Sequence, residues 1–318
     1  MDKDKKRWRG TREGFGEGLV ILGEKNQKIV VLSADLTKST RANFFKERFP
    51  HRFLELGVAE QNMMGVAAGL SLAGYIPYVC TYGIFSTGRC WEQLRTSICY
   101  NNCNVKIEGA HAGLLVGPDG ATHQATEDIA TTRVIPNLKV VIPVDSIEAK
   151  KATIAAANLY GPVYIRVSRE PTPILTDEDS SFTLGKANII REGKDVAVIA
   201  CGVEVSEALL AAEDMKEKEG IDVCVVNLHT IKPIDEEAII DVAKKTGAVV
   251  TAEEHQIFAG LGGAVAEVLS KNYPVPIEMV GLKDRFGESG KPYELLEKLG
   301  LSSSGIKKAI KKVLERKR

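Results

Sequence analysis

The sequence predicts an α/β fold of two successive domains, each with a mostly parallel sheet flanked by helices. Its 318 residues correspond to about two domains at roughly 150 residues per domain. Short runs rich in β-branched residues alternate with longer stretches of helical period, a pattern typical of parallel sheets wrapped by helices. A stretch rich in proline, serine and acidic residues, 170–195, interrupts this alternation and predicts a connection between the domains.

The first domain is expected to span residues 1–185 and to begin with a helix. Its strands are predicted from short apolar runs such as IVVLSA, and they lie at 29–34, 76–81, 104–108, 139–143 and 162–167. Helices are expected between them, at 11–25, 59–73, 86–100 and 146–159. This order of elements predicts a sheet covered by helices.

The second domain is expected to span residues 186–318 and to repeat the same theme at smaller size. Strands are predicted at 196–200, 223–227, 248–252 and 277–280. Between the first two, residues 205–215 carry apolar side chains three and four positions apart, as a helix packed on a core requires. The last helix, 305–318, places its isoleucines on one face and its lysines on the other, which favours a packed terminal helix.

The composition excludes several classes of function. The 42 basic and 42 acidic side chains cancel, so no overall field attracts nucleic acid or an anionic membrane. No apolar stretch approaches the ~20 residues needed to cross a bilayer. The basic start, 1–9, is followed by no apolar signal core, and the six cysteines form no C-x-x-C pair. We therefore expect a cytoplasmic protein with reduced cysteines and no nucleic-acid or membrane partner.

Two segments carry the candidate chemistry. The loop HAGLLVGPDGATHQ, 111–124, follows a predicted strand and collects His111, Asp119 and His123 among glycines, which offers a cation, an acceptor and a proton carrier together. The segment LGVAEQNMMG, 56–65, places Glu60 at the start of an otherwise apolar helix. A carboxylate that enters an apolar layer must find a partner or take up a proton. Both segments predict a ligand site at the carboxyl edge of the first sheet.

With SADLTKST at 33–40 and TYGIFSTGRCWEQLR at 81–95, these segments resemble the transketolase family of thiamine diphosphate enzymes. The resemblance covers essentially the whole chain, but only the carboxyl-terminal half of a transketolase. It implies a pyrimidine-binding domain followed by the transketolase C-terminal domain. It also implies transfer of a two-carbon ketol unit from a ketose phosphate to an aldose phosphate.

The resemblance assigns the cofactor side of the site. Glu60 corresponds to the family glutamate that hydrogen-bonds a ring nitrogen of the aminopyrimidine, where a carboxyl group in a site of low dielectric favours the imino tautomer. Tyr82 and Phe85 match aromatics that pack around that ring, and Asp35 matches an aspartate near the cofactor and the subunit contact. A third family aromatic is replaced by Gly88. The neighbouring Arg89 is expected to cover the gap.

The same resemblance assigns the substrate side. Four residues match family positions that hold the sugar phosphate, a set suited to a dianion: Arg12, Ser39, His111 and Arg169. Asp119 matches a residue that contacts the sugar hydroxyls, and His123 one that lines the channel near the reacting carbons. Glu60, His111 and His123 are the expected catalytic residues.

A family element is missing from the sequence. Thiamine diphosphate enzymes hold the diphosphate through Mg²⁺ with a G-D-G motif and a later asparagine, and we find neither set here. No metal ligand is therefore assigned in this chain. The resemblance implies a second subunit of a split transketolase, whose N-terminal partner holds Mg²⁺ and the diphosphate. Two copies of each chain, an α2β2 heterotetramer, would form two active sites across their interfaces.

Three alternatives remain at this point. The loop GPDGATHQ and Glu60 are also compatible with 1-deoxy-D-xylulose-5-phosphate synthase, although His111, the SADLTKS segment, and Arg12 with Arg169 favour transketolase. The beta subunit of 2-oxoacid dehydrogenases has a similar length and domain order, but its loop typically reads HSQ where this chain has THQ. A non-catalytic, transketolase-like regulatory or binding subunit is the third.

Overall fold

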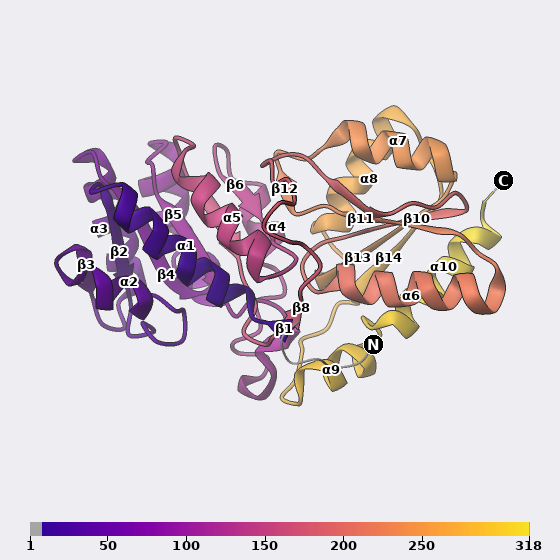
Figure 1. The fold of residues 1–318 in the computed structure, drawn as a ribbon, viewed down its shortest axis with the longest axis horizontal. Coiled ribbons are helices and arrows are strands. Elements are labelled where there is room, and N and C mark those ends of the chain that lie inside the picture. Colours follow the sequence, from indigo (N-terminus) through magenta and orange to yellow (C-terminus); the bar gives the residue numbers. More distant parts are fainter. Residues whose placement is uncertain (1–7, 318) are drawn as a thin grey trace.

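The computed structural model describes residues 8–317, which form two α/β domains side by side (Figure 1). The N-terminal domain carries the indigo to magenta part of the chain, and the C-terminal domain carries the orange to yellow part. Most of the basic start of the chain, 1–7, lies outside the described residues. The predicted fold class, two successive domains with mostly parallel sheets flanked by helices, is confirmed.

The N-terminal domain is built on a seven-stranded sheet in the order β12-β6-β7-β5-β4-β2-β3. All neighbours pair in parallel except β12 with β6. The strand β2 is buried along its whole length, which explains its apolar run, whereas the central strand β5 also buries Lys106 and Glu108. The strands are β2 (Ile29–Ser33), β3 (Phe53–Glu55), β4 (Ile76–Tyr82), β5 (Lys106–Ala110), β6 (Lys139–Val141), β7 (Val163–Arg166) and β12 (Thr230–Lys232).

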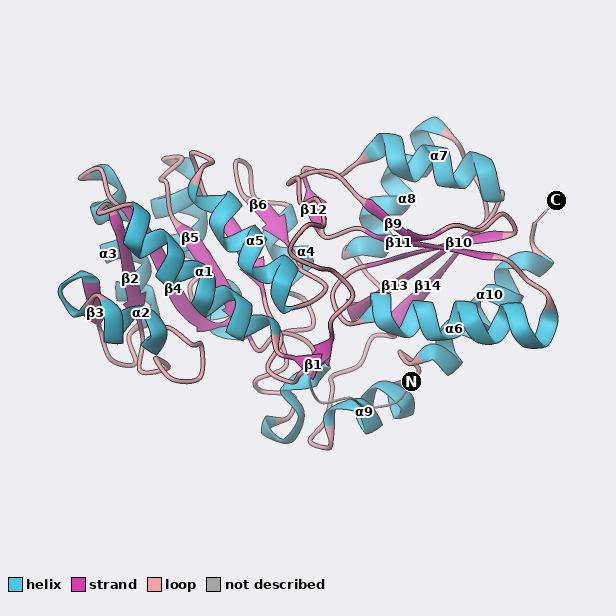
Figure 2. Ribbon diagram, viewed as in Figure 1, coloured by secondary structure: helices cyan, strands magenta, loops and turns pink. Residues whose placement is uncertain are grey.

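Helices cover both faces of this sheet (Figure 2). The helices α1 (Thr11–Lys25), α2 (Asn43–Arg48) and α5 (Ser146–Ala157) bury one apolar layer. The opposite layer is buried by α3 (Glu60–Leu72), the π-helical η4 (Gln93–Tyr100) and α4 (Asp128–Arg133). Gly14 permits the close crossing of α1 and α5, because a Cβ there would lie 1.8 Å from the carbonyl oxygen of Ser146.

The C-terminal domain has a five-stranded sheet in the order β14-β13-β10-β11-β9, parallel except for the edge strand β9. Its strands are β9 (Asn188–Arg191), β10 (Val196–Ala200), β11 (Val223–Asn227), β13 (Val249–Gln256) and β14 (Ile277–Leu282). One face packs on α6 (Glu204–Glu219) and α10 (Ser303–Glu315), and the other on α7 (Glu236–Thr246) and α8 (Leu261–Asn272). The short helix α9 (Pro292–Leu299) lies toward the N-terminal domain's glycine-rich loop.

Several elements differ from the sequence-based expectation. The predicted helix at 86–100 is divided at Cys90 into η3 (Phe85–Arg89) and η4, both with the wide turns of a π-helix. The expected connection, 170–195, also holds two strands: β8 (Thr172–Pro173), which pairs with β1 (Trp8–Arg9), and β9. These strands are short and lie at sheet edges, so they lack the apolar runs that mark buried strands.

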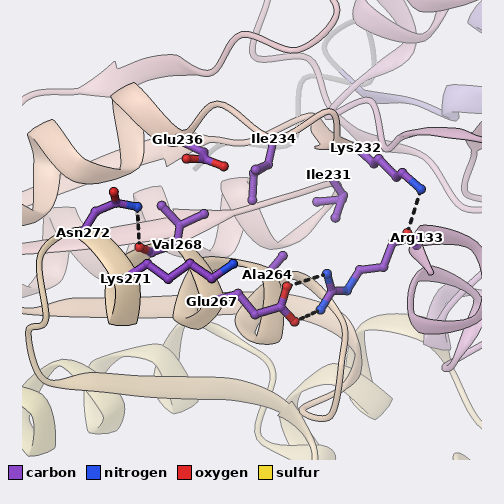
Figure 3. A pocket seen from close by; sticks show the side chains of 10 residues that line it. All are labelled: Arg133, Ile231, Lys232, Ile234, Glu236, Ala264, Glu267, Val268, Lys271 and Asn272. Atoms are coloured by element: carbon purple, nitrogen blue, oxygen red, sulfur yellow. Dashed lines mark hydrogen bonds and ion pairs between the residues drawn. The ribbon is translucent and has the colours of Figure 1, made fainter. Parts of the chain in front are cut away.

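The two domains share a cleft of about 240 Å³ between α4, β12, α7 and α8 (Figure 3). Two of its cations, Arg133 and Lys232, have partners within the chain. Arg133 forms an ion pair with Glu267, and Lys232 Nζ donates to the carbonyl oxygens of Arg133 at 3.0 Å and Ile135 at 2.6 Å. We therefore regard this cleft as a seam between the domains.

Within residues 8–317, no helix has the length and apolar character that crossing a membrane requires. The six cysteines are all buried, and none of them forms a disulfide.

We expect Gly14→Ala to destabilise the chain by about 1–3 kcal/mol or more, because the added methyl group would force α1 away from α5. The matched control is Gly65→Ala in α3, where a Cβ would meet nothing within 4 Å. Alanine there should stabilise the helix by up to about 1 kcal/mol. Urea unfolding of the isolated chain measures both changes, and equal midpoints for the two variants would contradict the expectation.

Candidate functional site

The predicted site residues gather at the carboxyl edge of the N-terminal sheet. Tyr82 ends β4, His111 directly follows β5, and Arg169 lies three residues beyond β7. Ser39 lies in the loop between β2 and α2, and Arg12 lies in the first turn of α1. Because these strands are parallel, their carboxyl ends meet at one edge, where α/β proteins bind ligands.

Glu60 is the first residue of α3 and its side chain is only 3 % exposed. The positive end of the helix favours a negative charge there. Arg89 Nη1 donates a hydrogen bond to Glu60 Oε2 at 2.9 Å, and its guanidinium carbon lies 4.6 Å from the centre of the Phe85 ring. Glu60 therefore holds a flat N–H donor that stacks on an aromatic ring.

Beside this pair, four rings form one aromatic wall. Tyr82 and Phe85 stack in parallel with their centres 5.8 Å apart. His123 meets both edge-on, at 6.1 Å and 5.6 Å, and the ring of His111 lies 4.4 Å from Tyr82. The two histidines come from opposite ends of the glycine-rich loop, 111–124, so the fold of this loop brings them together. Cofactor-side and substrate-side residues from the sequence analysis thus share one wall.

His111 is buried and its backbone is left-handed, with φ of 54°. Its Nε2 lies 3.1 Å from Arg12 Nη1, which can only donate, and 3.2 Å from the carbonyl oxygen of Ser39, which can only accept, so these two contacts favour opposite tautomers. Burial, with the charges of Arg12 and Arg169, lowers the pKa of His111 to about 3. The Nδ1 atom is buried without a hydrogen-bond partner in the described part of the chain. A neutral imidazole with one unpartnered ring nitrogen therefore lines the site.

Three arginines surround the same position. Arg12 Nη1 also donates to the carbonyl oxygen of Ser39 at 3.1 Å, and Arg169 pairs with Asp119 at 3.1 Å. Arg41, which sequence reasoning missed, pairs with Glu13 at 2.9 Å, and the same carboxylate oxygen lies 3.4 Å from Arg12. Three cations against two carboxylates leave a positive field suited to an anion.

Two predicted residues take other roles in the geometry. Ser39 contacts Arg12 through its backbone carbonyl oxygen, whereas the sequence analysis assigned it for its hydroxyl group. Asp35 is exposed, with φ of 61°, and its backbone N–H donates to Glu55 Oε1 at 2.7 Å. Glu55 also accepts from the Thr37 hydroxyl at 2.6 Å, so it shapes the loop after β2. The contacts of Asp35 point to this loop and not to the aromatic wall.

Across residues 8–317, no cluster of three or more histidine, cysteine, aspartate or glutamate side chains has the arrangement of a metal site.

Comparisons with known proteins match this architecture on both domains. The family model of the transketolase pyrimidine-binding domain matches residues 9–173, and that of the transketolase C-terminal domain matches residues 185–306. The chain belongs to the transketolase family.

Similar proteins include separate chains of divided transketolases. The 6-deoxy-6-sulfo-D-fructose transketolase subunit SqwH of Clostridium sp. (strain MSTE9) is 43% identical, over 96% of this chain and 95% of that protein. One chain of the apulose-4-phosphate transketolase of Phocaeicola vulgatus is 37% identical, over 93% of this chain and 94% of that one. Human transketolase is 35% identical, and the match covers 95% of this chain but 48% of the human protein.

Solved structures agree with these matches. A structure described as a split-gene transketolase, inactive beta4 tetramer, is 49% identical, with a TM-score of 0.91 over 97% of this chain and 99% of that chain. Transketolase of Campylobacter jejuni is 25% identical, with a TM-score of 0.82 over 96% of this chain and 47% of that chain. This transketolase-family chain is thus similar over nearly its whole length to separate chains of divided transketolases.

In this transketolase subunit, we expect His111 to stay neutral between about pH 5 and pH 8. In the unfolded chain this histidine is protonated below about pH 6.5, whereas in the folded chain it is protonated only below about pH 3. The free energy of unfolding therefore falls as the pH falls from about 6.5 to about 3. Arg12→Met removes one nearby cation and should move the pKa of His111 upward. NMR of labelled histidines measures both, and an imidazole that titrates near its ordinary pKa would contradict the prediction.

Proposed function

We propose that this chain is the pyrimidine-binding subunit of a thiamine diphosphate-dependent transketolase, which moves a two-carbon ketol unit between ketose and aldose phosphates. The observation that carries the proposal is the buried Glu60 carboxylate, hydrogen-bonded to a flat cation that stacks on Phe85. A carboxylate and an aromatic face in this relation fit a planar ring that donates N–H groups.

The Arg89 guanidinium stands in for such a ring. It is planar and cationic, it donates to Glu60, and it lies over Phe85, as an aminopyrimidine held by the same two residues would. At Gly88 a Cβ would meet only Ile84 at 3.9 Å, so one side of this position is open. Arg89 would leave Glu60 when the cofactor binds and would cover that open side. Thiamine diphosphate would supply the carbon nucleophile that adds to the ketose carbonyl.

The residues of this chain would share the remaining work. Glu60 would hold the proton that sets the tautomer of the aminopyrimidine, and Tyr82 with Phe85 would exclude water from the ring. His111 would form a hydrogen bond to the substrate through Nδ1, since that nitrogen is buried without a partner among the described residues. His123, beside Phe85, would line the path to the reacting carbons.

The positive charge of the arginines around His111 favours an anionic sugar as the substrate. Arg12, Arg41 and Arg169 converge where Asp119 offers an acceptor for hydroxyl groups, which suits a phosphate at one end of a polyol. The names of two relatives contain a sulfonated and a phosphorylated sugar, and both sugars carry an anionic group. We propose phosphate esters here, because a dianion matches three arginines better than a sulfonate monoanion does.

A partner subunit would complete the site. Human transketolase is about twice as long as the matched region, so its other half corresponds to a separate chain, the N-terminal subunit. Small and apolar residues are exposed along α3 and just before it: Val58 and Leu72 are 70% and 76% exposed, and a Cβ at Gly65 or Gly69 would meet nothing within 4 Å. The N-terminal subunit would cover these residues, hold Mg²⁺ and the diphosphate, and assemble with this chain as α2β2.

The deciding experiment assays ketol transfer from xylulose 5-phosphate by this chain alone and mixed with its N-terminal partner, with thiamine diphosphate and Mg²⁺ present. We expect turnover only in the mixture, because each chain supplies half of the cofactor site. In the mixture, Glu60→Gln keeps the side-chain shape but cannot share the proton, and we expect a fall in kcat of about 100-fold or more. Unaltered folding by circular dichroism is the control. Activity of the single chain, or normal turnover of the variant, would refute the proposal.

We expect Arg169→Met to raise KM for xylulose 5-phosphate by roughly 10- to 150-fold, the equivalent of one lost charged hydrogen bond. A ketose without a phosphate, L-erythrulose, provides the internal control, since its use should change little. Steady-state kinetics of the reconstituted complex on both ketoses gives the comparison. An equal loss on the two ketoses would assign Arg169 to the loop structure rather than to the phosphate.

A further inference from the structure

The glycine-rich loop of the N-terminal domain is fixed largely by the C-terminal domain. The backbone N–H of Gln256, at the end of β13, donates to the carbonyl oxygen of Thr126 at 2.8 Å. Gln124 Nε2 donates to the carbonyl oxygen of Glu288 at 3.0 Å. The helix α9 packs against the part of the loop that includes Asp119. Elements far apart in sequence therefore set the shape of the loop on which His111, Asp119 and His123 lie.

One side chain of the C-terminal domain reaches into this loop. The Glu254 carboxylate, on β13, accepts the backbone N–H of Leu115 at 2.5 Å, in the first turn of the loop's 3-10 segment (Leu114–Asp119). Gly113 makes room for it, because a Cβ there would lie 2.4 Å from the carboxyl carbon. Gly113 also has φ of 80°, which L-residues with a side chain avoid. Both the conformation and the space at Gly113 are matched to this carboxylate.

Arg166, the last residue of β7, fixes Glu254 from the other side. Its Nη2 donates to the backbone carbonyl oxygens of Glu254 at 2.9 Å and of Ala125 at 3.2 Å. Its Nε donates to Asp128 at 2.8 Å, and the Tyr164 hydroxyl donates to the same carboxylate oxygen at 2.7 Å. Arg166 is thus buried, and it ties the end of the loop at Ala125 to the strand that carries Glu254, whose carboxylate lies 4.0 Å from its Nη1.

From this geometry we infer that Glu254 is a positioning residue: its carboxylate holds the turn at 113–115 so that His111 and Asp119 meet the substrate correctly. The role in catalysis rests on the proposed function, whereas the hold on the loop does not. Neither the family-level matches nor the sequence motifs assign it, and it lies outside the domain that carries the substrate residues. It acts through the loop and touches none of the expected reacting atoms.

The neighbouring Glu253 provides a matched control. It is on the same strand, equally buried, and points to the opposite face of the sheet, where it accepts the backbone N–H groups of Leu261 at 2.7 Å and Gly262 at 2.8 Å. It therefore makes the same kind of contact, but with the start of α8. Removing a buried carboxylate affects the stability of the chain in both the Glu254 and the Glu253 variants. A change confined to the loop would therefore be due to the contact that Glu254 makes with it.

The test compares Glu254→Gln with Glu253→Gln in the full chain and in the complex reconstituted with the N-terminal partner. By hydrogen–deuterium exchange, we expect Glu254→Gln to speed the exchange of the amides in 113–115 about 10-fold or more, and Glu253→Gln to speed only those at 261–262. In the complex, Glu254→Gln should raise KM for xylulose 5-phosphate about 10-fold. The Kd for thiamine diphosphate should stay unchanged, because Glu60 and Phe85 are on other elements.

Two results would overturn the inference: exchange at 113–115 that stays at the wild-type rate, or equal changes in the two variants at both segments. If Glu254→Gln does not fold, Glu254→Asp keeps the charge but withdraws the carboxylate by one methylene, and the same exchange result is expected. If the wild-type complex shows no ketol transfer, the proposed function fails while the exchange measurement still decides the role of Glu254. If transfer is normal and KM does not move in the variant, only the inference fails.

Discussion

A carboxylate kept out of water at the start of an apolar helix is the interaction on which the site depends. Glu60 gains from the positive end of α3, but burial of a charge without a partner costs several kcal/mol in real proteins. The ion pair with Arg89 offsets that cost, and the half-exposed Arg89 guanidinium is free to move away. Because Arg89 can move away, the Glu60 carboxylate would bind this side chain in the free chain and the ring of the ligand in the proposed complex.

The second constraint is that the site is made from both domains. His111 and His123 lie on the N-terminal domain, while contacts that shape their loop come from β13, the chain after β14, and α9. The strand β12 extends the N-terminal sheet from within the C-terminal part of the sequence. A rotation of one domain against the other would break these contacts and the sheet pairing together, so the two domains move as a unit at this edge.

Much of the fold could be predicted from the sequence, and so could a set of candidate site residues that the structure brings together, for identifiable physical reasons. Strands such as β2 and β10 are buried on both faces and therefore read as unbroken apolar runs. The strands β3, β9 and β12 were missed because they are short edge strands with mixed composition. Glu60, His111 and Arg12 were found through motifs, whereas Arg41 was overlooked although it lies two residues beyond Ser39. The hydrogen bond between Glu254 and the loop could not be predicted from the sequence, since 139 residues separate Glu254 from Leu115.

The orientation of His111 illustrates what local sequence cannot specify. Its motif marked the residue, but the polar neighbours of its Nε2 atom, Arg12 and the carbonyl oxygen of Ser39, lie 99 and 72 residues earlier in the chain. Burial first, and then repulsion by the nearby arginines, lowers the pKa of His111, so the ring stays neutral while the arginines bear the charge. In the proposed function, the arginines would attract the anion, and the neutral imidazole would bind a polar group of the sugar without competing for the phosphate.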